Sequence, residues 1–148
     1  MASEFRCLHR VQFSDTDMAG IMHFANFFRY MEETEHAFFR SIGLSVHMED
    51  SGSLISWPRV HAECDYKAPL RFEDEFEVRL VVREKRDKAL VFDFQFLKPN
   101  SEVEFARGSV TAVCVTVNRE AGTMRAVSIP PAISQQIEAA DSTNEPEG

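Results

Sequence analysis

Two carboxylates, Asp15 and Asp17, lie in the segment Asp15-Thr16-Asp17-Met18-Ala19-Gly20-Ile21, between an alternating apolar segment and a long amphipathic segment that begins near Phe24. The first backbone N–H groups of a helix have no partner inside the helix, and the helix dipole is positive there. A carbonyl oxygen bound at such a helix start is polarised while Asp17 approaches its carbon, as nucleophile or as general base. The segment therefore predicts a site for acyl transfer.

The same residues admit a purely structural interpretation. An aspartate in an Asp-x-x-Gly turn often only caps the next helix or stabilises the loop. For an isolated motif this is the favoured interpretation of Asp17, and the flanking strand and helix are part of what weighs against it; Asp15 is predicted to form the turn. If the two carboxylates lie close together, each raises the pKa of the other, and a pH–rate profile of Asp15→Asn tests this hypothesis.

The elements that position this segment are predicted from hydrophobic periodicity. Residues 5–13 alternate as a strand, and residues 23–42 repeat apolar side chains at helical spacing before Gly43, which is expected to cap the helix. Further β-type segments follow at 54–66, 75–86, 89–98 and 102–118, and a short helix follows Pro130-Pro131. The pattern predicts an α+β domain in which an antiparallel sheet of four or five strands wraps around one long helix.

Length and charge restrict the class of protein. The chain has 148 residues and a formal net charge of −8. The length predicts a single domain over residues 1–138, followed by a disordered tail over 139–148 that lacks an apolar anchor. The acidic balance argues against a general nucleic-acid binder. Residues 1–10 contain no apolar run, and no segment approaches the ~20 apolar residues of a membrane span, so the chain is predicted to be soluble and cytoplasmic.

Metal sites are not predicted. Glu33-Thr34-Glu35-His36 contains a Glu-x-x-His unit, but di-iron bundles need two such units and two further glutamates from four helices, and this chain offers one long helix. A solvated helix face is the favoured interpretation. The three cysteines are widely spaced and form no Cys-x-x-Cys, which predicts neither a zinc site nor a disulfide framework: Cys7, Cys64 and Cys114.

A local positive patch surrounds the predicted hairpin between the segments at 75–86 and 89–98. It comprises Arg83, Lys85, Arg86 and Lys88, with Asp87 among them. Such a patch suits the phosphates of a nucleotide. Ordinary solubility of the hairpin or protection of a sheet edge explains it equally well.

Several motifs resemble a known family, the hotdog-fold acyl-CoA thioesterases of the 4-hydroxybenzoyl-CoA thioesterase type. The segment from Val11 to Ile21, Val-Gln-Phe-Ser-Asp-Thr-Asp-Met-Ala-Gly-Ile, resembles the family's strand-end signature, and Asn26, Phe27 and Tyr30 continue it into the helix. Tyr66-Lys67-Ala68-Pro69, followed by Asp74 and alternating strands, resembles the second half of the family's domain. The resemblance covers about residues 5–130 and implies a hotdog fold, with a sheet of about five strands around one long helix.

The resemblance also implies roles for residues. The second aspartate of the signature is the family's catalytic carboxylate, which corresponds to Asp17, and a backbone N–H at the helix start, that of Phe24, binds the thioester oxygen. Glu32 corresponds to a carboxylate that can meet the acyl ring, although a surface glutamate is as plausible at this position. Some relatives have a histidine where this chain has Phe24, so His23, one residue earlier, is a further candidate that departs from the pattern.

The expected function is hydrolysis of an acyl-CoA thioester to a free acid and CoA, without a cofactor. Lys85, Arg86 and Lys88 would meet the CoA phosphates, and Phe27 would line the acyl group or remain in the core. By resemblance we expect a dimer that extends one sheet across two subunits, commonly doubled to a tetramer, with each active site at a subunit boundary.

Two alternatives stay open within the same fold. An acyl-CoA hydratase needs an Asp/His pair five residues apart, whereas Asp17 and His23 are six apart with no Asn-Pro between them. A non-catalytic acyl-CoA binding module would usually accompany a DNA-binding segment, which this acidic chain does not show.

Overall fold

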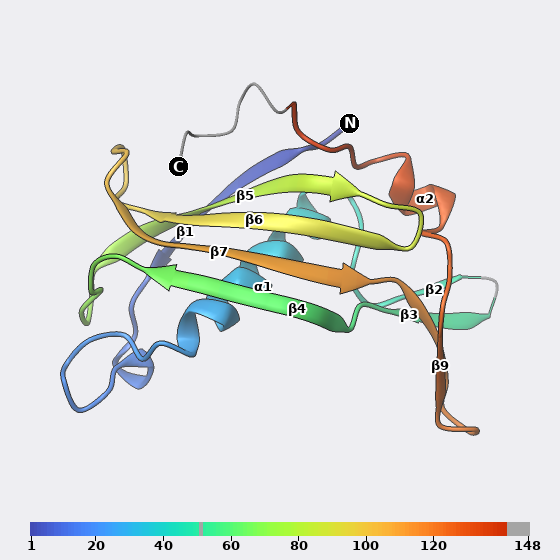
Figure 1. The fold of residues 1–148 in the computed structure, drawn as a ribbon, viewed down its shortest axis with the longest axis horizontal. Helices are drawn as coiled ribbons and strands as arrows, with labels where there is room; N and C mark the ends of the chain where they lie inside the picture. The colour runs from blue at the N-terminus through green and yellow to red at the C-terminus, as the bar shows by residue number, and fades with distance from the viewer. Residues whose placement is uncertain (51, 142–148) are drawn as a thin grey trace.

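The computed structural model describes residues 1–50 and 52–141 and contains one long helix packed on a five-stranded antiparallel sheet (Figure 1). The helix is α1 (Asn26–Ser41). In spatial order the strands are β1 (Glu4–Arg10), β5 (Glu75–Lys85), β6 (Ala89–Leu97), β7 (Glu104–Val113) and β4 (Arg59–Tyr66). The α+β class, the single long helix and the five-stranded sheet were predicted from the sequence.

Side-chain alternation explains how helix and sheet join. Along β5 every second residue, from Phe76 to Val82, is buried, while the residues between them are more exposed. A strand with one buried face shows this period of two. On α1 the buried side chains recur at helical spacing and include Phe27, Met31 and Phe38, so the helix turns one apolar stripe to the sheet.

The helix approaches β7 closely at Gly108. A Cβ atom at this position would lie 2.2 Å from Met31 Cε and 2.8 Å from the carbonyl oxygen of Glu63 on β4. A side chain at residue 108 would therefore collide with both the helix and the neighbouring strand. The absence of a side chain here lets α1 lie close to the middle of the sheet.

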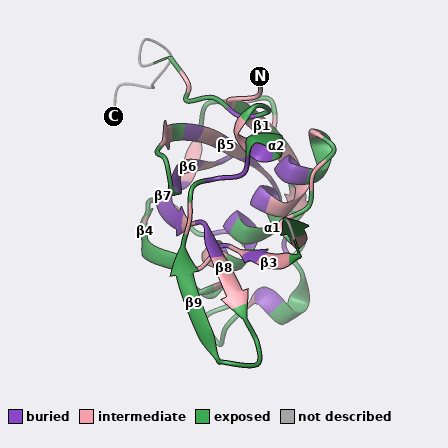
Figure 2. Ribbon diagram, turned by 90° about the vertical axis from the view of Figure 1, so that its right-hand side faces the viewer, coloured by how far each residue is buried: buried purple, intermediate pink, exposed green. Residues whose placement is uncertain are grey.

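A second, smaller sheet was not predicted. It contains four strands in the order β2 (Met48–Asp50), β3 (Ser53–Ser56), β8 (Val115–Asn118) and β9 (Thr123–Ala126). Figure 2 shows β9 exposed on this side of the molecule. The predicted strand at 54–66 is wrong because Trp57 and Pro58 separate β3 from β4, and the predicted strand at 102–118 is wrong because Cys114 separates β7 from β8.

The remaining predicted boundaries shift by a few residues. β1 ends at Arg10, and a 3₁₀ helix, η1 (Phe13–Asp15), occupies the end of the predicted first strand. α1 starts at Asn26 rather than at residue 23, and Gly43 follows it with a φ of 78°, as expected of a C-terminal cap. The short helix expected after Pro130 is α2 (Pro131–Ser134). Of the tail predicted to be disordered, residues 142–148 lie outside the described residues.

An ion pair in which only the carboxylate is buried joins α1 to the edge strand β4. Glu35 is 1% exposed, and its Oε2 lies 2.6 Å from Nη2 of Arg59. Its Oε1 accepts no hydrogen bond from the described residues. Burial raises the pKa of Glu35 to about 7, and the opposing attraction of Arg59 offsets only part of that effect. The Glu-x-x-His unit thus contains a buried structural carboxylate, which contradicts a fully solvated helix face.

We predict that Gly108→Ala destabilises the protein by about 1–3 kcal/mol, because the added methyl must displace Met31 or the β4 backbone. Chemical denaturation measures the effect. Ser109→Ala is the matched control on the same strand, since the Ser109 hydroxyl has no hydrogen-bond partner among the described residues and its loss should change stability little. Equal stability of Gly108→Ala and the native protein would contradict the close approach.

Glu35 also predicts a pH dependence of stability. Its folded pKa of about 7 lies above the usual 4.5, so the folded state binds the proton more tightly, and the contribution of Glu35 to the free energy of unfolding falls as pH rises from about 4.5 to about 7. Glu35→Gln removes the titrating group and should flatten this part of the profile. Urea denaturation between pH 4.5 and 8 tests it, and identical profiles for the two proteins would show that Glu35 does not titrate as described.

Candidate active site

The candidate catalytic segment forms a loop, residues 16–23, at the end of the sheet where β1 ends and β5 begins (Figure 1, lower left). The loop is fixed to the segment that precedes β5. The Met22 N–H donates to the Leu70 carbonyl at 2.7 Å, and Ile21 pairs with Arg71 in an isolated β-bridge. The loop is therefore part of the scaffold's hydrogen-bonding pattern.

Internal hydrogen bonds give the loop a defined shape. The Asp17 N–H donates to the Ile21 carbonyl at 2.9 Å, and the Gly20 N–H donates to the Asp17 carbonyl at 3.0 Å. Gly20 has a φ of 79°, a left-handed conformation that favours glycine. A bridge between Thr16 and Met22 closes the turn.

The Asp17 side chain is exposed on this loop. Its Oδ1 accepts the Ala19 N–H at 2.9 Å, and no described residue donates a hydrogen bond to Oδ2. The carboxylate thus makes the turn contact expected of a capping aspartate and still has one oxygen open to solvent. Turn formation and a catalytic role are compatible at this residue, because the turn contact orients the carboxylate.

The N–H of Phe24 lies in the turn just before α1. Neighbouring N–H groups have partners: that of His23 donates to the Asp15 carbonyl at 2.8 Å, and that of Asn26 donates to the His23 carbonyl at 2.9 Å. The Phe24 N–H donates to no described residue, while its own carbonyl accepts the Tyr66 hydroxyl at 2.9 Å. The expected donor is therefore in a turn two residues before the helix starts, and it has no partner among the described residues.

His23 contributes to the start of the helix. Its Nδ1 accepts the Ala25 N–H at 3.2 Å, and its ring stacks on Phe24 with centroids 4.5 Å apart. With Nδ1 occupied as an acceptor, the imidazole is oriented by the helix start. These contacts place His23 in the turn before the helix, where its ring accepts the N–H of the N-cap residue, Ala25.

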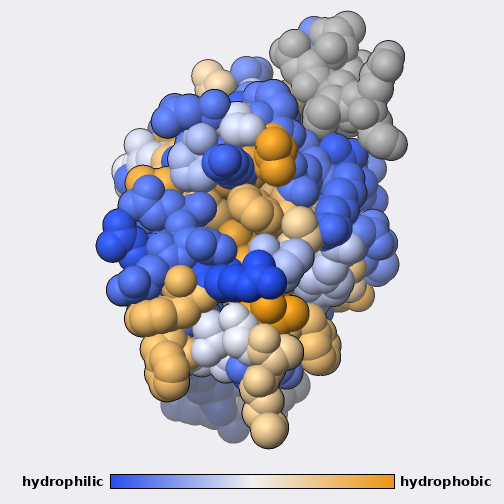
Figure 3. Space-filling view, turned by 90° about the vertical axis from the view of Figure 1, so that its left-hand side faces the viewer, coloured by the Kyte–Doolittle hydropathy of each residue, from blue (hydrophilic) through white to orange (hydrophobic). Residues whose placement is uncertain are grey.

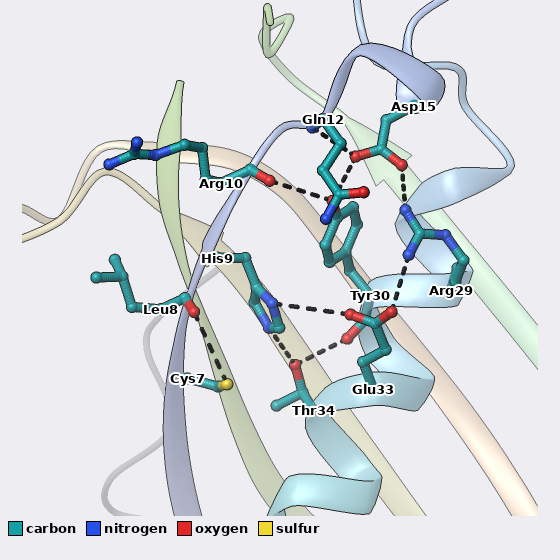
Figure 4. Close-up of polar contacts among 10 residues, drawn as sticks. All are labelled: Cys7, Leu8, His9, Arg10, Gln12, Asp15, Arg29, Tyr30, Glu33 and Thr34. Atoms are coloured by element: carbon teal, nitrogen blue, oxygen red, sulfur yellow. Dashed lines mark hydrogen bonds and ion pairs between the residues drawn. The ribbon is translucent and has the colours of Figure 1, made fainter. Parts of the chain in front are cut away.

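Asp15 is more than the turn-forming residue that the sequence predicted. It is 2% exposed, and its Oδ2 accepts the Gln12 N–H at 2.8 Å, which holds the turn (Figure 4). The same carboxylate also accepts hydrogen bonds from two residues of α1, Arg29 and Tyr30. Burial raises the pKa of Tyr30 to about 12, so its hydroxyl stays protonated and donates. Arg29 and Tyr30 are 14 and 15 residues from Asp15 in the sequence, so no local sequence pattern predicted these contacts.

A second polar link joins β1 to α1 beside this one. His9 is partly buried, stacks on Phe76 with centroids 5.5 Å apart, and has its Nε2 3.1 Å from Thr34 Oγ1 (Figure 4). Burial lowers the pKa of His9, which keeps the imidazole neutral at pH 7. His9 was not among the predicted site residues, because it reads as part of an alternating strand.

Two predicted contacts for the acyl group lie on α1. Phe27 is buried and packs against Phe96 and Tyr66 with both centroid distances 5.0 Å, so it belongs to the core. Glu32 is exposed, and its Oε1 lies 3.9 Å from Nε2 of His36. Of Phe27 and Glu32, only Glu32 has a side chain exposed at the surface.

The basic patch lies at the other end of the subunit. Glu75, at the start of β5, pairs with Arg10, whereas the hairpin follows the end of β5 eleven residues on. At about 3.3 Å per residue the strand separates the two ends by roughly 35 Å. Lys85 Nζ donates to the Ser134 and Ile137 carbonyls, and Arg86 pairs with Glu84. The structure does not bring the patch to Asp17 within one subunit.

Apolar side chains are exposed on the loops that carry and adjoin Asp17. Large exposed side chains on the loops at this end are those of Phe13, Met18, Phe24 and Phe72. Figure 3, which faces this end of the molecule, shows apolar surface in its lower half next to polar residues. Apolar surface beside a few polar groups is typical of ligand sites and of contacts between subunits.

Other possible sites are separate from this loop. A cavity of about 280 Å³ lies on the sheet face away from α1 and is lined by alternating acidic and basic side chains and by Ser109. In the described part of the chain, no group of three or more His, Cys, Asp or Glu side chains could hold a metal ion. None of the described helices combines the length and apolar character needed to cross a membrane.

Comparison with known proteins finds a matching family and similar sequences. The profile of the thioesterase-like superfamily matches residues 11–137. A protein of Aquifex aeolicus, provisionally assigned as an esterase, is 36% identical over 110 residues, which cover 74% of this chain and 82% of the relative. A 1,4-dihydroxy-2-naphthoyl-CoA hydrolase of Prochlorococcus marinus is 29% identical over 123 residues, covering 78% of this chain and 77% of the hydrolase.

The fold is similar to that of 4-hydroxybenzoyl-CoA thioesterase from Pseudomonas sp. strain CBS-3. The TM-score is 0.76 at 18% identity, and the match covers 91% of this chain and 99% of the thioesterase. This likeness identifies the hotdog fold that the resemblance implied. The profile match over residues 11–137 shows that the chain belongs to the thioesterase-like superfamily.

Proposed function

We propose that this protein hydrolyses aromatic acyl-CoA thioesters to the free acid and CoA. The observation that carries the proposal is the loop at 16–23, which presents the exposed carboxylate of Asp17 and is followed at once by the Phe24 N–H. Within the part of the chain that the structure describes, neither Asp17 Oδ2 nor this N–H has a hydrogen-bond partner. The class of substrate is supported by the curated relatives, among which 1,4-dihydroxy-2-naphthoyl-CoA hydrolase is named, and by the apolar surface around Asp17.

The chemistry follows from these two groups. The thioester oxygen accepts the Phe24 N–H, which stabilises the negative charge that grows on it, an effect typically worth about 3 kcal/mol of barrier. In the general-base route Asp17 takes a proton from water as the oxygen of that water bonds to the carbonyl carbon. The C–S bond then breaks, and the CoA thiolate recovers the proton. In the nucleophilic route Asp17 forms an anhydride, CoA leaves, and water cleaves the anhydride.

The second subunit that the resemblance implies has a place to bind. β4 lies at the edge of the five-stranded sheet, and nearly all of its residues are exposed, including Val60 at 65%. A long exposed edge strand is a template for pairing with another chain. Two copies that pair antiparallel through β4 about a two-fold axis would form one ten-stranded sheet.

This pairing reconciles the basic patch with the catalytic loop. A two-fold axis at the β4 edge places opposite ends of the two subunits side by side, so the β5–β6 hairpin of one copy lies at the end that carries Asp17 in the other. Arg86 and Lys88 would then meet the CoA phosphates bound at the other subunit's site. The Lys85 ammonium donates to two carbonyls beside α2, so we assign the phosphate contact to Arg86 and Lys88.

Asp17→Asn tests the proposed function directly. The amide still accepts the Ala19 N–H but can neither attack nor take a proton, so we expect thiol release from aryl-CoA substrates to fall by at least about 100-fold. A thiol-reactive dye measures the rate, and chromatography identifies the free acid. Asp74→Asn is the matched control, because Asp74 caps the adjacent turn through the Arg71 N–H and should keep the native rate. Hydration without thiol release, or binding without turnover, would support the alternative functions instead.

The CoA contact gives a separate prediction. Replacing Arg86 and Lys88 together by serine should raise KM for the CoA thioester by about tenfold and leave kcat unchanged, because the lost contacts bind the phosphates in ground and transition state alike. The N-acetylcysteamine thioester of the same acid lacks those phosphates and should show no change. The exposed pair Arg119 and Arg125, replaced in the same way, is the charge-matched control. A rise in KM for both thioesters would contradict phosphate recognition by the hairpin.

A further inference from the structure

We propose that Asp15 is a positioning residue of the hydrolytic site, which holds the loop of Asp17 and the Phe24 N–H against α1. The inference rests on the proposed function and goes beyond it, since Asp15 itself does not contact the substrate. Three sets of contacts made by the buried Asp15 support the inference. Asp15 contacts the end of the strand before the loop, the helix after the loop, and the residues that close the loop.

The carboxylate of Asp15 is bound from two elements that the loop connects. The Gln12 N–H, just after β1, donates to Oδ2 at 2.8 Å, and the Tyr30 hydroxyl on α1 donates to the same oxygen. Arg29, also on α1, donates to Oδ1. One ionised side chain therefore connects the segment before the loop to the first turns of the helix.

The main chain of Asp15 closes the loop. Its carbonyl oxygen accepts the His23 N–H at 2.8 Å and the Asn26 Nδ2 at 2.8 Å. These bonds join Asp15, directly before the loop, to His23 and Asn26, which flank Phe24 and Ala25. Displacing Asp15 would move the Asp17 carboxylate and the Phe24 N–H relative to each other.

Asp15 is unsuited to act on the substrate itself. It is 2% exposed and turned into the protein, whereas Asp17, two residues on, is exposed. Its charge is balanced by Arg29, which also binds Glu33 at 2.8 Å and lies over the Tyr30 ring at 4.4 Å. An aspartate with this environment fixes geometry, and a misplacement of about 1 Å in a catalytic group can cost about 100-fold in rate.

Asp15→Asn tests the role with little change in shape. An amide turns one acceptor oxygen into an NH₂ group that faces donors, so the network cannot stay intact. We expect kcat for aryl-CoA hydrolysis to fall by about 100-fold while KM changes less than about threefold and circular dichroism shows a folded protein. Glu104→Gln is the matched control: Glu104 binds Lys67 and Arg107 on the scaffold, and its loss should leave kcat unchanged.

A second variant, Tyr30→Phe, tests the positioning role independently of Asp15→Asn. Tyr30→Phe deletes one donor to Asp15 and should lower kcat by a smaller factor, about tenfold. The double variant Asp15→Asn with Tyr30→Phe should be no slower than Asp15→Asn alone, because both act on the same network. If Asp15→Asn does not fold, the kcat of Tyr30→Phe decides.

The contrary outcomes are distinct. Native kcat in Asp15→Asn, or in Tyr30→Phe where the first does not fold, overturns the inference, as does a kcat loss matched by Glu104→Gln. Thiol release that survives Asp17→Asn overturns the proposed function instead. Loss of activity in Asp17→Asn together with native kcat in Asp15→Asn leaves the hydrolase in place and removes only the positioning role.

Discussion

Close packing of α1 on the five-stranded sheet is the constraint on which the rest of the structure depends. Gly108 leaves room for Met31, and the buried Phe, Val and Leu side chains of β5 and β6 provide an apolar surface for the helix. Once the helix is held there, its start lies at one end of the sheet, beside the end of β1. The chain between Arg10 and Asn26 must connect these two points, and that connection carries Asp17 and Phe24.

The site thus combines an exposed loop with a buried support. Asp17 uses one carboxylate oxygen inside the turn, and its other oxygen accepts no hydrogen bond from the described residues. The N–H groups of His23, Ala25 and Asn26 are bound in the turn before the helix, whereas that of Phe24 has no partner among residues 1–50 and 52–141. Two carboxylates in this part of the chain are buried, and each pairs with an arginine: Asp15 with Arg29, and Glu35 with Arg59. Each of these pairs connects α1 to another element, which gives the helix a fixed position relative to the loop and the edge strand.

Hydrophobic periodicity predicted the helix and the strands whose buried faces repeat along the sequence. The strict alternation of 75–80 and 91–96 predicted strands at 75–86 and 89–98, and the helical repeat before Gly43 predicted the long helix; these bounds are close to those of β5, β6 and α1. Periodicity does not report which sheet a strand joins, so the breaks at Pro58 and Cys114 and the second sheet were missed. The catalytic loop could be located because its residues are adjacent in sequence. The partners of Asp15 on α1 and the distance between the hairpin and the loop depend on tertiary packing and had no local signal.

The most direct test is a crystal structure with a non-hydrolysable ketone analogue of an aryl-CoA. The account predicts that the ketone oxygen lies about 2.7–3.2 Å from the Phe24 nitrogen and that the Asp17 carboxylate faces the carbonyl carbon at about 3–3.5 Å or through one water. A ketone oxygen bound to any other group, with Asp17 turned to solvent away from the analogue, would contradict it.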